Sequence, residues 1–220
     1  IGEESTQYIG IPVLNLTEMP LRQAHAKVIE NEWFEATDIE LGPLSPAAVT
    51  QIAFQLKQAK AVEDLESEVT VTVRVESPVL EYSYEFETAL SVVAADATYK
   101  RTRHSLVDGS VQFYGVRPPT GVAPDDGFSL ALSLHGAGVG AHGQVNSYSP
   151  KDWAYVVAPT NRRPFGFDWE EWGRLDGLET LDDAMEIFDI DPTRVYVTGH
   201  SMGGHGTWQF GVHQADRFRV

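Results

Sequence analysis

The fold of the second half of this chain is decided by the stretch Val195-Tyr196-Val197-Thr198-Gly199-His200-Ser201-Met202-Gly203-Gly204. An apolar run rich in β-branched residues ends in a glycine-rich turn, and Met202 to His213 can follow as a helix. Gly199, Ser201 and Gly203 fit the pattern G-x-S-x-G, which in a strand–turn–helix setting holds a serine at a sharp elbow. Side chains at the two glycine positions would collide in such a turn. The serine hydroxyl would stand at the helix N-terminus, where the helix dipole favours negative charge.

Three short apolar runs precede the serine, at Ser129–Leu134, Ala154–Ala158 and Arg194–Thr198, and the last of them leads into the elbow. Between the last two, Leu175–Phe188 carries apolar residues on one helical face. Before the first, Asp108-Gly109 predicts a tight hairpin turn, followed by a strand over Ser110–Arg117. Near-continuously apolar strands that alternate with helices are typical of a parallel sheet covered on both faces. The sequence therefore predicts an α/β fold for residues 101–220.

A second glycine-rich segment, His135-Gly136-Ala137-Gly138-Val139-Gly140, directly follows the strand that ends at Leu134. Small residues let backbone N–H groups face a cavity. In an acyl-transfer enzyme these N–H groups would stabilise the tetrahedral oxyanion together with the N–H of Met202. The alternative is a phosphate cradle, but the Lys-Ser/Thr ending of a P-loop and the pattern G-x-G-x-x-G are both absent.

With these elements the sequence resembles the α/β-hydrolases, and among them the prolyl-oligopeptidase-like peptidases and the esterase-D and polyester-depolymerase-like esterases. The resemblance runs from about Ser105 to Phe218. It is carried by SLHGAG (Ser133–Gly138), YVVAPTNR (Tyr155–Arg162), DWEEWGRLD (Asp168–Asp176), IDPTRVYVTGHSMGGHGTW (Ile190–Trp208) and ADRF (Ala215–Phe218). It implies that Ser201 is a nucleophile and that the amides of Met202 and of Gly136 or Ala137 form the oxyanion hole.

The acid and base of a catalytic triad are harder to find. In this fold they follow the serine along the chain, as Asp or Glu and then His. His213 and Asp216 follow Ser201, but both lie on or just past the helix that starts at the serine. We therefore expect the triad Asp and His beyond this chain, which would make it the first part of a longer hydrolase or one chain of a complemented enzyme. A complete protein with a degenerate site is the competing interpretation.

The other histidines have weaker claims. His205 lies one turn along the nucleophile helix, which favours a packing or hydrogen-bonding role, and His135 is expected to be structural. His142, in the loop beyond, is a candidate for lining the site. The spacing of the histidines matches no zinc pattern, and the chain has no cysteine, so we expect neither a metal nor a cofactor.

Arginines and tryptophans gather between the oxyanion loop and the elbow, in residues 161–172. One interpretation is a loop anchored by aromatic packing. The other is a wall of the substrate site, in which Arg162 or Arg163 meets a carboxylate and Trp169 and Trp172 form an apolar subsite.

Residues 1–100 differ in character and match no family that we can name. They carry a net charge of -11 out of -16, which indicates a boundary near residue 100. Apolar spacing predicts a helix over 20–36, and Ser45-Pro46 predicts the start of a second one that continues to about residue 56. Glu63–Glu68 is expected to be a solvated acidic break, and the runs 69–75 and 80–87 alternate as two half-buried strands. This predicts an accessory region of two helices followed by antiparallel strands, before an incomplete α/β-hydrolase domain.

Composition excludes several functions. The acidic balance argues against nucleic acid and anionic membrane surfaces, because both attract Lys and Arg. Absent cysteines and high acidity lead us to expect a protein exported by a bacterium, although they fit the cytoplasm as well.

The sequence therefore predicts a serine hydrolase that cleaves a peptide or carboxylic ester bond, with a peptide favoured by the resemblance. A carboxylesterase or polyester depolymerase and a non-catalytic binding protein are the alternatives. We expect the 220-residue chain alone to be inactive, and its partners to be the substrate and the missing C-terminal half.

Overall fold

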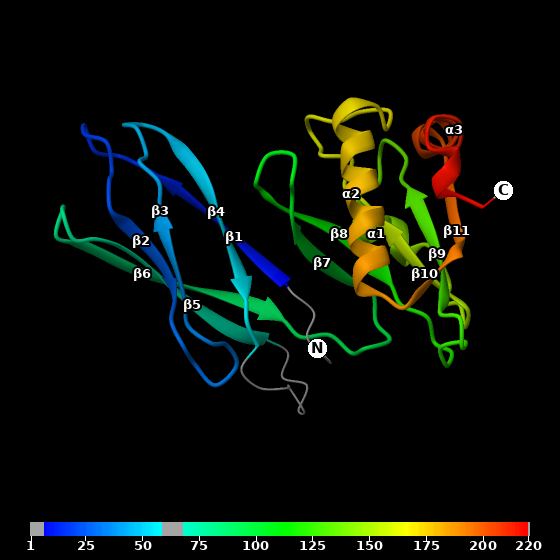
Figure 1. The fold of residues 1–220 in the computed structure, drawn as a ribbon, viewed down its shortest axis with the longest axis horizontal. Coiled ribbons are helices and arrows are strands. Elements are labelled where there is room, and N and C mark those ends of the chain that lie inside the picture. The colour runs from blue at the N-terminus through cyan, green and yellow to red at the C-terminus, as the bar shows by residue number, and fades with distance from the viewer. Residues whose placement is uncertain (1–6, 59–67, 220) are drawn as a thin grey trace. The chain divides into compact units, whose positions relative to one another are not determined.

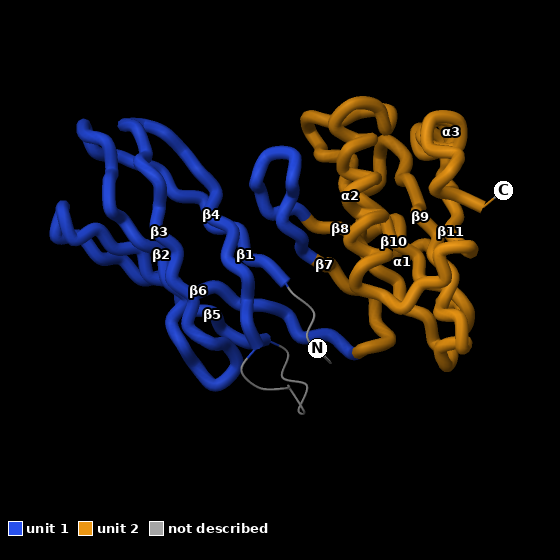
Figure 2. The backbone as a smooth tube through the Cα atoms, viewed as in Figure 1, with its two compact units in different colours: residues 1–94, 102–112 blue, residues 95–101, 113–220 orange. Residues whose placement is uncertain are grey.

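The computed structural model describes residues 7–58 and 68–219, which form two compact units. Unit 1 contains residues 1–94 and 102–112, and unit 2 contains residues 95–101 and 113–220 (Figure 2). The chain thus passes between the units near residues 94, 101 and 112, because the hairpin formed by 102–112 groups with unit 1.

Unit 1 is built from antiparallel strands (Figure 1). The strands are β1 (Gln7–Leu14), β2 (Ala24–Val28), β3 (Thr37–Leu41), β4 (Val49–Leu56), β5 (Glu68–Ser77) and β6 (Tyr82–Ser91). β1 pairs with β4, and the other four form a sheet in the order β3-β2-β5-β6. Inward side chains of both sheets share one apolar core, which includes Ile11, Phe54 and Val71.

The helix predicted over 20–36 is wrong, because this segment contains strand β2. Ala24, Ala26 and Val28 are buried, whereas His25 and Lys27 between them are only half-buried, which is the alternation of a strand. β2 lies between β3 and β5, so its backbone groups are paired on both sides. Alanine is compatible with both helices and strands, so the pairing of this segment with its neighbouring strands decided that it forms a strand.

The second predicted helix is also wrong. Ala48 N–H donates to the Ser45 carbonyl over 3.0 Å, and Ala47 has a φ of 58°, so Ser45-Pro46 opens a turn rather than a helix. Strand β4 follows, with Ile52 and Phe54 buried. Proline at the second position of a turn with positive φ at the third is a type II arrangement, which uses the same residues as a helix start.

The two predicted strands over 69–75 and 80–87 are confirmed as β5 and β6, which pair antiparallel from Glu68 with Ser91 to Ser77 with Tyr82. Of the predicted acidic break, Glu68 begins β5 and the rest lies outside the described residues.

Unit 2 is organised around a five-stranded sheet in the order β11-β9-β10-β8-β7. The strands are β7 (Tyr99–His104), β8 (Val111–Arg117), β9 (Phe128–Leu134), β10 (Ala154–Ala158) and β11 (Ile190–Gly199). β9 pairs in parallel with both β10 and β11, which confirms the predicted parallel arrangement, whereas β8 runs antiparallel to β10. Gly109, with a φ of 71°, lies in the predicted turn between the neighbouring strands β7 and β8.

The helices of unit 2 are α1 (Ala141–Asn146), α2 (Glu171–Ile187) and α3 (Met202–His213), with a short 3-10 turn at Ala215–Arg217 (Figure 1). α3 has the predicted bounds, and α2 begins one turn before the predicted Leu175. Gly177 of α2 has room only for hydrogen, because a Cβ there would lie 2.5 Å from the Phe210 ring of α3. No helix in the described part of the chain is long and apolar enough to span a membrane.

Candidate active site

The turn between β11 and α3 is an elbow with Ser201 at its tip. Ser201 has a φ of 56° and a ψ of -120°, a combination that non-glycine residues rarely adopt. A Cβ on Gly199 would overlap the carbonyl of Gly203, and one on Gly203 would overlap the carbonyl oxygen of Leu134. Glycine is therefore required at both positions. The local sequence folds in this way because only these two residues admit such a close approach of backbone.

Ser201 is exposed, and the loop after β9 lies beside it. A Cβ placed on Gly136 would lie 3.6 Å from the Ser201 Cβ and 3.4 Å from the His200 carbonyl oxygen. The parallel strands β9 and β11 produce this proximity, since Gly199 pairs with Leu134 at their carboxyl ends. Two glycine-rich segments that are 65 residues apart thus meet at one edge of the sheet.

The N–H groups of this region are available to a ligand. The hydrogen bonds found within residues 7–58 and 68–219 include none donated by the backbone N–H of Ala137, Gly138 or Met202. Met202 begins α3, where the first N–H groups lack intrahelical partners and the dipole is positive. The arrangement can accept an oxygen that develops negative charge beside the Ser201 hydroxyl.

His135 is structural, in agreement with its predicted role. Its side chain is fully buried, with Nδ1 2.9 Å from the Gly136 carbonyl oxygen and Nε2 3.2 Å from the Thr160 carbonyl oxygen. The imidazole therefore ties the oxyanion loop to the end of β10.

Trp169 does not form a substrate subsite, and that expectation is corrected. The side chain is completely buried, and its Nε1–H donates to the His135 carbonyl over 3.1 Å. A Cβ on Gly206 of α3 would lie 2.5 Å from the indole Cγ, so the ring occupies the space beside this glycine. Trp169 therefore anchors this loop by aromatic packing, which is the other interpretation of the segment.

Arg162 is likewise used inside the protein rather than toward a substrate. It is 6% exposed, and its Nε lies 3.6 Å from Asp176 and its Nη2 3.2 Å from Glu179, both on α2. Asp176 is fully buried and also accepts a hydrogen bond from the Thr160 hydroxyl over 3.0 Å. The carboxylate that we expected from a substrate is supplied by the chain itself.

Arg163 and Trp172 are exposed, and both contact other parts of this chain. The two Nη groups of Arg163 donate to the carbonyl oxygen of Ala137, over 2.7 and 2.6 Å. Trp172 is 39% exposed, and the Arg162 guanidinium lies 5.7 Å from the centre of its ring. A substrate contact of Trp172 stays a prediction.

Among the described residues, no hydrogen bond joins a histidine side chain to the Ser201 hydroxyl. His205 Nε2 lies 3.1 Å from the carboxylate of Glu170 and 3.3 Å from the amide of Gln209, which confirms its predicted hydrogen-bonding role. His142 is half-buried on α1, and no hydrogen bond to its Nδ1 is found within the described residues. Its place in the site stays a prediction. Within residues 7–58 and 68–219, no set of three or more His, Asp or Glu side chains is arranged to hold a metal ion.

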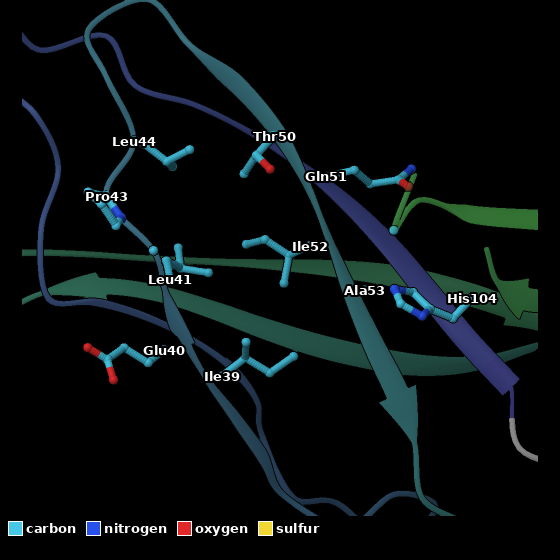
Figure 3. A pocket seen from close by; sticks show the side chains of 12 residues that line it. Ile39, Glu40, Leu41, Pro43, Leu44, Thr50, Gln51, Ile52, Ala53 and His104 are labelled. Atoms are coloured by element: carbon cyan, nitrogen blue, oxygen red, sulfur yellow. The ribbon is translucent and has the colours of Figure 1, made fainter. Parts of the chain in front are cut away.

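A separate hollow of about 400 Å³ lies in unit 1 (Figure 3). It is lined mainly by β3, β4 and the Gly42–Leu44 segment, with His104 at one end and Glu40 at the other. These two ionisable groups do not converge, so the hollow offers no acid–base pair.

No family model matches this chain. A protein from Arthroderma benhamiae, described as an uncharacterized secreted protein, is 29% identical over 130 residues, which cover 51% of this chain and 14% of that protein. The chain thus spans about one seventh of the length of this relative.

Solved structures that match include a thermostable esterase, with 18% identity, coverage of 96% of this chain and 71% of that one, and a TM-score of 0.44. An S-formylglutathione hydrolase from Agrobacterium tumefaciens is 20% identical over 55% of each chain, with a TM-score of 0.45. A prolyl endopeptidase is 12% identical over 98% of this chain and 35% of that one, with a TM-score of 0.37. By its parallel strands and its serine elbow, the chain resembles the α/β-hydrolase superfamily.

Proposed function

We propose that these residues belong to a serine hydrolase that cleaves a peptide or carboxylic ester bond through an acyl-enzyme on Ser201. The observation that carries the proposal is the strained elbow, which holds Ser201 exposed beside Gly136 and at the N-terminus of α3. Backbone strain in a non-glycine residue persists where the surrounding structure enforces it, and it gathers at functional sites.

The Ser201 oxygen would attack the substrate carbonyl carbon and pass its proton to a histidine. The carbonyl oxygen becomes negative and is stabilised by the N–H groups of Met202 and of the loop that contains Gly136 and Ala137. Collapse of this intermediate breaks the bond to the amine or alcohol, which leaves with the proton from the histidine, and water then releases the acyl group.

We place the histidine and its acid partner outside this chain, because no described histidine side chain forms a hydrogen bond with Ser201. The resemblance favours a peptide over an ester. The secreted relative supports action outside the cell, whereas the expected bacterial source has no support, because that relative is fungal.

A fluorophosphonate probe tests the proposal. The full-length natural polypeptide that contains these residues should be labelled in its native state on the Ser201 peptide, as read by mass spectrometry, and not after heat denaturation. Ser201→Ala should abolish labelling, whereas Ser149→Ala, at an exposed loop serine, should leave it unchanged. Absence of labelling in the folded full-length protein would favour the non-catalytic binding protein. A panel of fluorogenic peptides and esters then separates the two substrate classes.

A further inference from the structure

We propose that Arg163 is a positioning residue for the oxyanion hole, which it aims by holding the carbonyl side of the Ala137–Gly138 peptide. The inference rests on the proposed function. It replaces the substrate-binding role expected for this arginine from the sequence.

In a trans peptide the C=O and the following N–H point in opposite directions within one plane. A hydrogen bond that fixes the carbonyl of one residue therefore also fixes the direction of the next residue's N–H. Contacts to the carbonyl oxygens of a loop can therefore orient its N–H groups for binding an oxyanion, although these contacts do not touch the ligand.

The first peptide of the oxyanion loop is held in this way. The Gly136 carbonyl accepts from the Val139 N–H over 3.2 Å and lies 2.9 Å from His135 Nδ1. The N–H of Ala137, in the same peptide, consequently points away from these partners. No other partner for it is found among the residues that the structure describes.

The second peptide is held by Arg163. Both of its Nη groups converge on the Ala137 carbonyl oxygen, at 2.7 and 2.6 Å, which fixes the N–H of Gly138 on the opposite side. A cationic donor makes a shorter and stronger hydrogen bond than a neutral one. The charge also polarises the peptide so that its N–H becomes a better donor. Arg163 thus fixes and polarises a peptide of the loop whose Gly136 lies beside Ser201.

The segment that carries Arg163 is itself strained. Five non-glycine residues have positive φ: Asn161 (63°), Arg162 (51°), Asp168 (55°), Trp169 (61°) and Glu171 (42°). Each conformation is unfavourable, and several in one loop persist only where packing enforces them. Here the packing includes buried Asn161, for which Gly166 and Gly173 leave room, since a Cβ on either would overlap Asn161.

The same segment reaches the other half of the site. Trp169 holds the His135 carbonyl and packs beside Gly206 of α3, the helix that starts next to Ser201. One rigid loop therefore positions the oxyanion loop at two carbonyls and abuts the nucleophile helix. A substrate-binding arginine would not need its two Nη groups committed to backbone in this way.

The test compares Arg163→Ala and Arg163→Lys in the full-length natural polypeptide, with Lys151→Ala as a control. Lys151 precedes the amino end of β10, whereas the site lies at the carboxyl ends of the strands, so the control removes one positive charge away from the site. Hydrogen exchange followed by mass spectrometry should show faster exchange of residues 135–140 in Arg163→Ala, with α3 and the Lys151→Ala protein unchanged.

Steady-state kinetics then show whether the loss of activity is in kcat or in KM. Arg163→Ala should lower kcat by about 10- to 100-fold, less than or equal to the loss of a whole oxyanion donor. KM should be unchanged on neutral and acidic substrates alike. The affinity for a boronate that mimics the tetrahedral intermediate should fall by the same factor as kcat/KM. Arg163→Lys should recover part of the loss.

Unchanged exchange at residues 135–140 in Arg163→Ala overturns the inference, as does a rise in KM confined to acidic substrates. The exchange arm does not depend on turnover. A wild-type protein that neither hydrolyses substrates nor reacts with the fluorophosphonate would overturn the proposed function instead, so the two failures are distinguishable.

Discussion

The indole of Trp169 donates a hydrogen bond to the backbone carbonyl of His135 over 3.1 Å, and the two rings meet edge to face with their centroids 4.9 Å apart. This pair joins the strained segment after β10 to the loop after β9. Both residues are completely buried, so the contact is part of the core that supports the candidate site.

Trp169→Phe tests this relationship, because it keeps an aromatic ring and removes the donor. The His135 carbonyl would lose its indole partner in the interior, and we expect the free energy of unfolding to fall by about 1–3 kcal/mol. Urea unfolding followed by circular dichroism measures the change. Trp208→Phe, at a residue of α3 that is 77% exposed, should stay within about 0.5 kcal/mol of wild type. Equal losses in both variants would refute a structural role for the hydrogen bond.

Gly203→Ala tests the elbow. The added methyl group would overlap the Leu134 carbonyl, so the turn must move, and we expect a loss of about 1–3 kcal/mol together with loss of fluorophosphonate labelling. Gly211→Ala, in the same helix, meets no heavy atom within 4 Å. It should raise stability by about 0.5–1 kcal/mol, because alanine favours the helix. Denaturant midpoints of the two variants therefore move in opposite directions; a stable, labelled Gly203→Ala protein would count against the tight turn.

Arg162→Ala separates a structural arginine from a substrate-binding one. Its removal leaves the fully buried Asp176 without its cationic partner, and the loss of one member of a buried pair costs about 3–5 kcal/mol. Arg217→Ala breaks an exposed pair with Asp182, for which about 0–1 kcal/mol is expected. Chemical denaturation measures both. If Arg162→Ala is as stable as wild type but binds acidic substrates less well, the sequence-based interpretation was right after all.

Alkaline pH should destabilise unit 2 through Tyr99, which is partly buried, and Tyr114, which is fully buried. Burial raises the pKa of Tyr99 to about 12, and burial followed by the nearby Asp183 carboxylate raises that of Tyr114 well above its usual value. The unfolded chain then loses phenolic protons first, near pH 10. The stabilisation from each tyrosine is therefore fully present below that pH. As pH rises from 10 toward 12, the free energy of unfolding falls by up to about 1.4 kcal/mol per pH unit for each tyrosine.

Tyr99→Phe should remove the contribution of one tyrosine from the slope of the free energy of unfolding against pH. Urea unfolding at pH 8, 10 and 11 measures the free energy of unfolding. The ultraviolet absorbance of tyrosinate reports ionisation in parallel. A slope between pH 10 and 11 that is identical in wild type and variant would show that Tyr99 ionises equally in the folded and unfolded states.

The predictions for unit 2 succeeded where local pattern and tertiary environment agree. The strand that ends at Gly199 and the helix that starts at Met202 follow from an apolar run, two glycines and a helical continuation, all within one short stretch. β9 and β10 are buried on both faces, so their sequences are mostly apolar, and the strands could be recognised from them.

The predictions for unit 1 failed where a sequence is compatible with two periods. Ala24 and Val28 are four residues apart and so fit one face of a helix, but they also lie on one side of a strand together with Ala26, and only pairing with β3 and β5 selects the strand. Ser45-Pro46 is equally suited to begin a helix or a turn, and the positive φ of Ala47 decides for the turn.

The sequence by itself determined the local part of the serine elbow, because a Cβ on Gly199 would overlap Gly203 only four residues along the chain. Glycine at 203 is required by a tertiary contact, since a Cβ there would overlap the carbonyl oxygen of Leu134 at the end of β9. Only the tertiary structure decided what the arginines and tryptophans of the 161–172 segment do. Arg162 meets carboxylates of α2, Arg163 meets the Ala137 carbonyl, and Trp169 meets His135. The type of a long polar side chain limits its partners to a chemical class, but the choice among them depends on which group the folded backbone brings within reach.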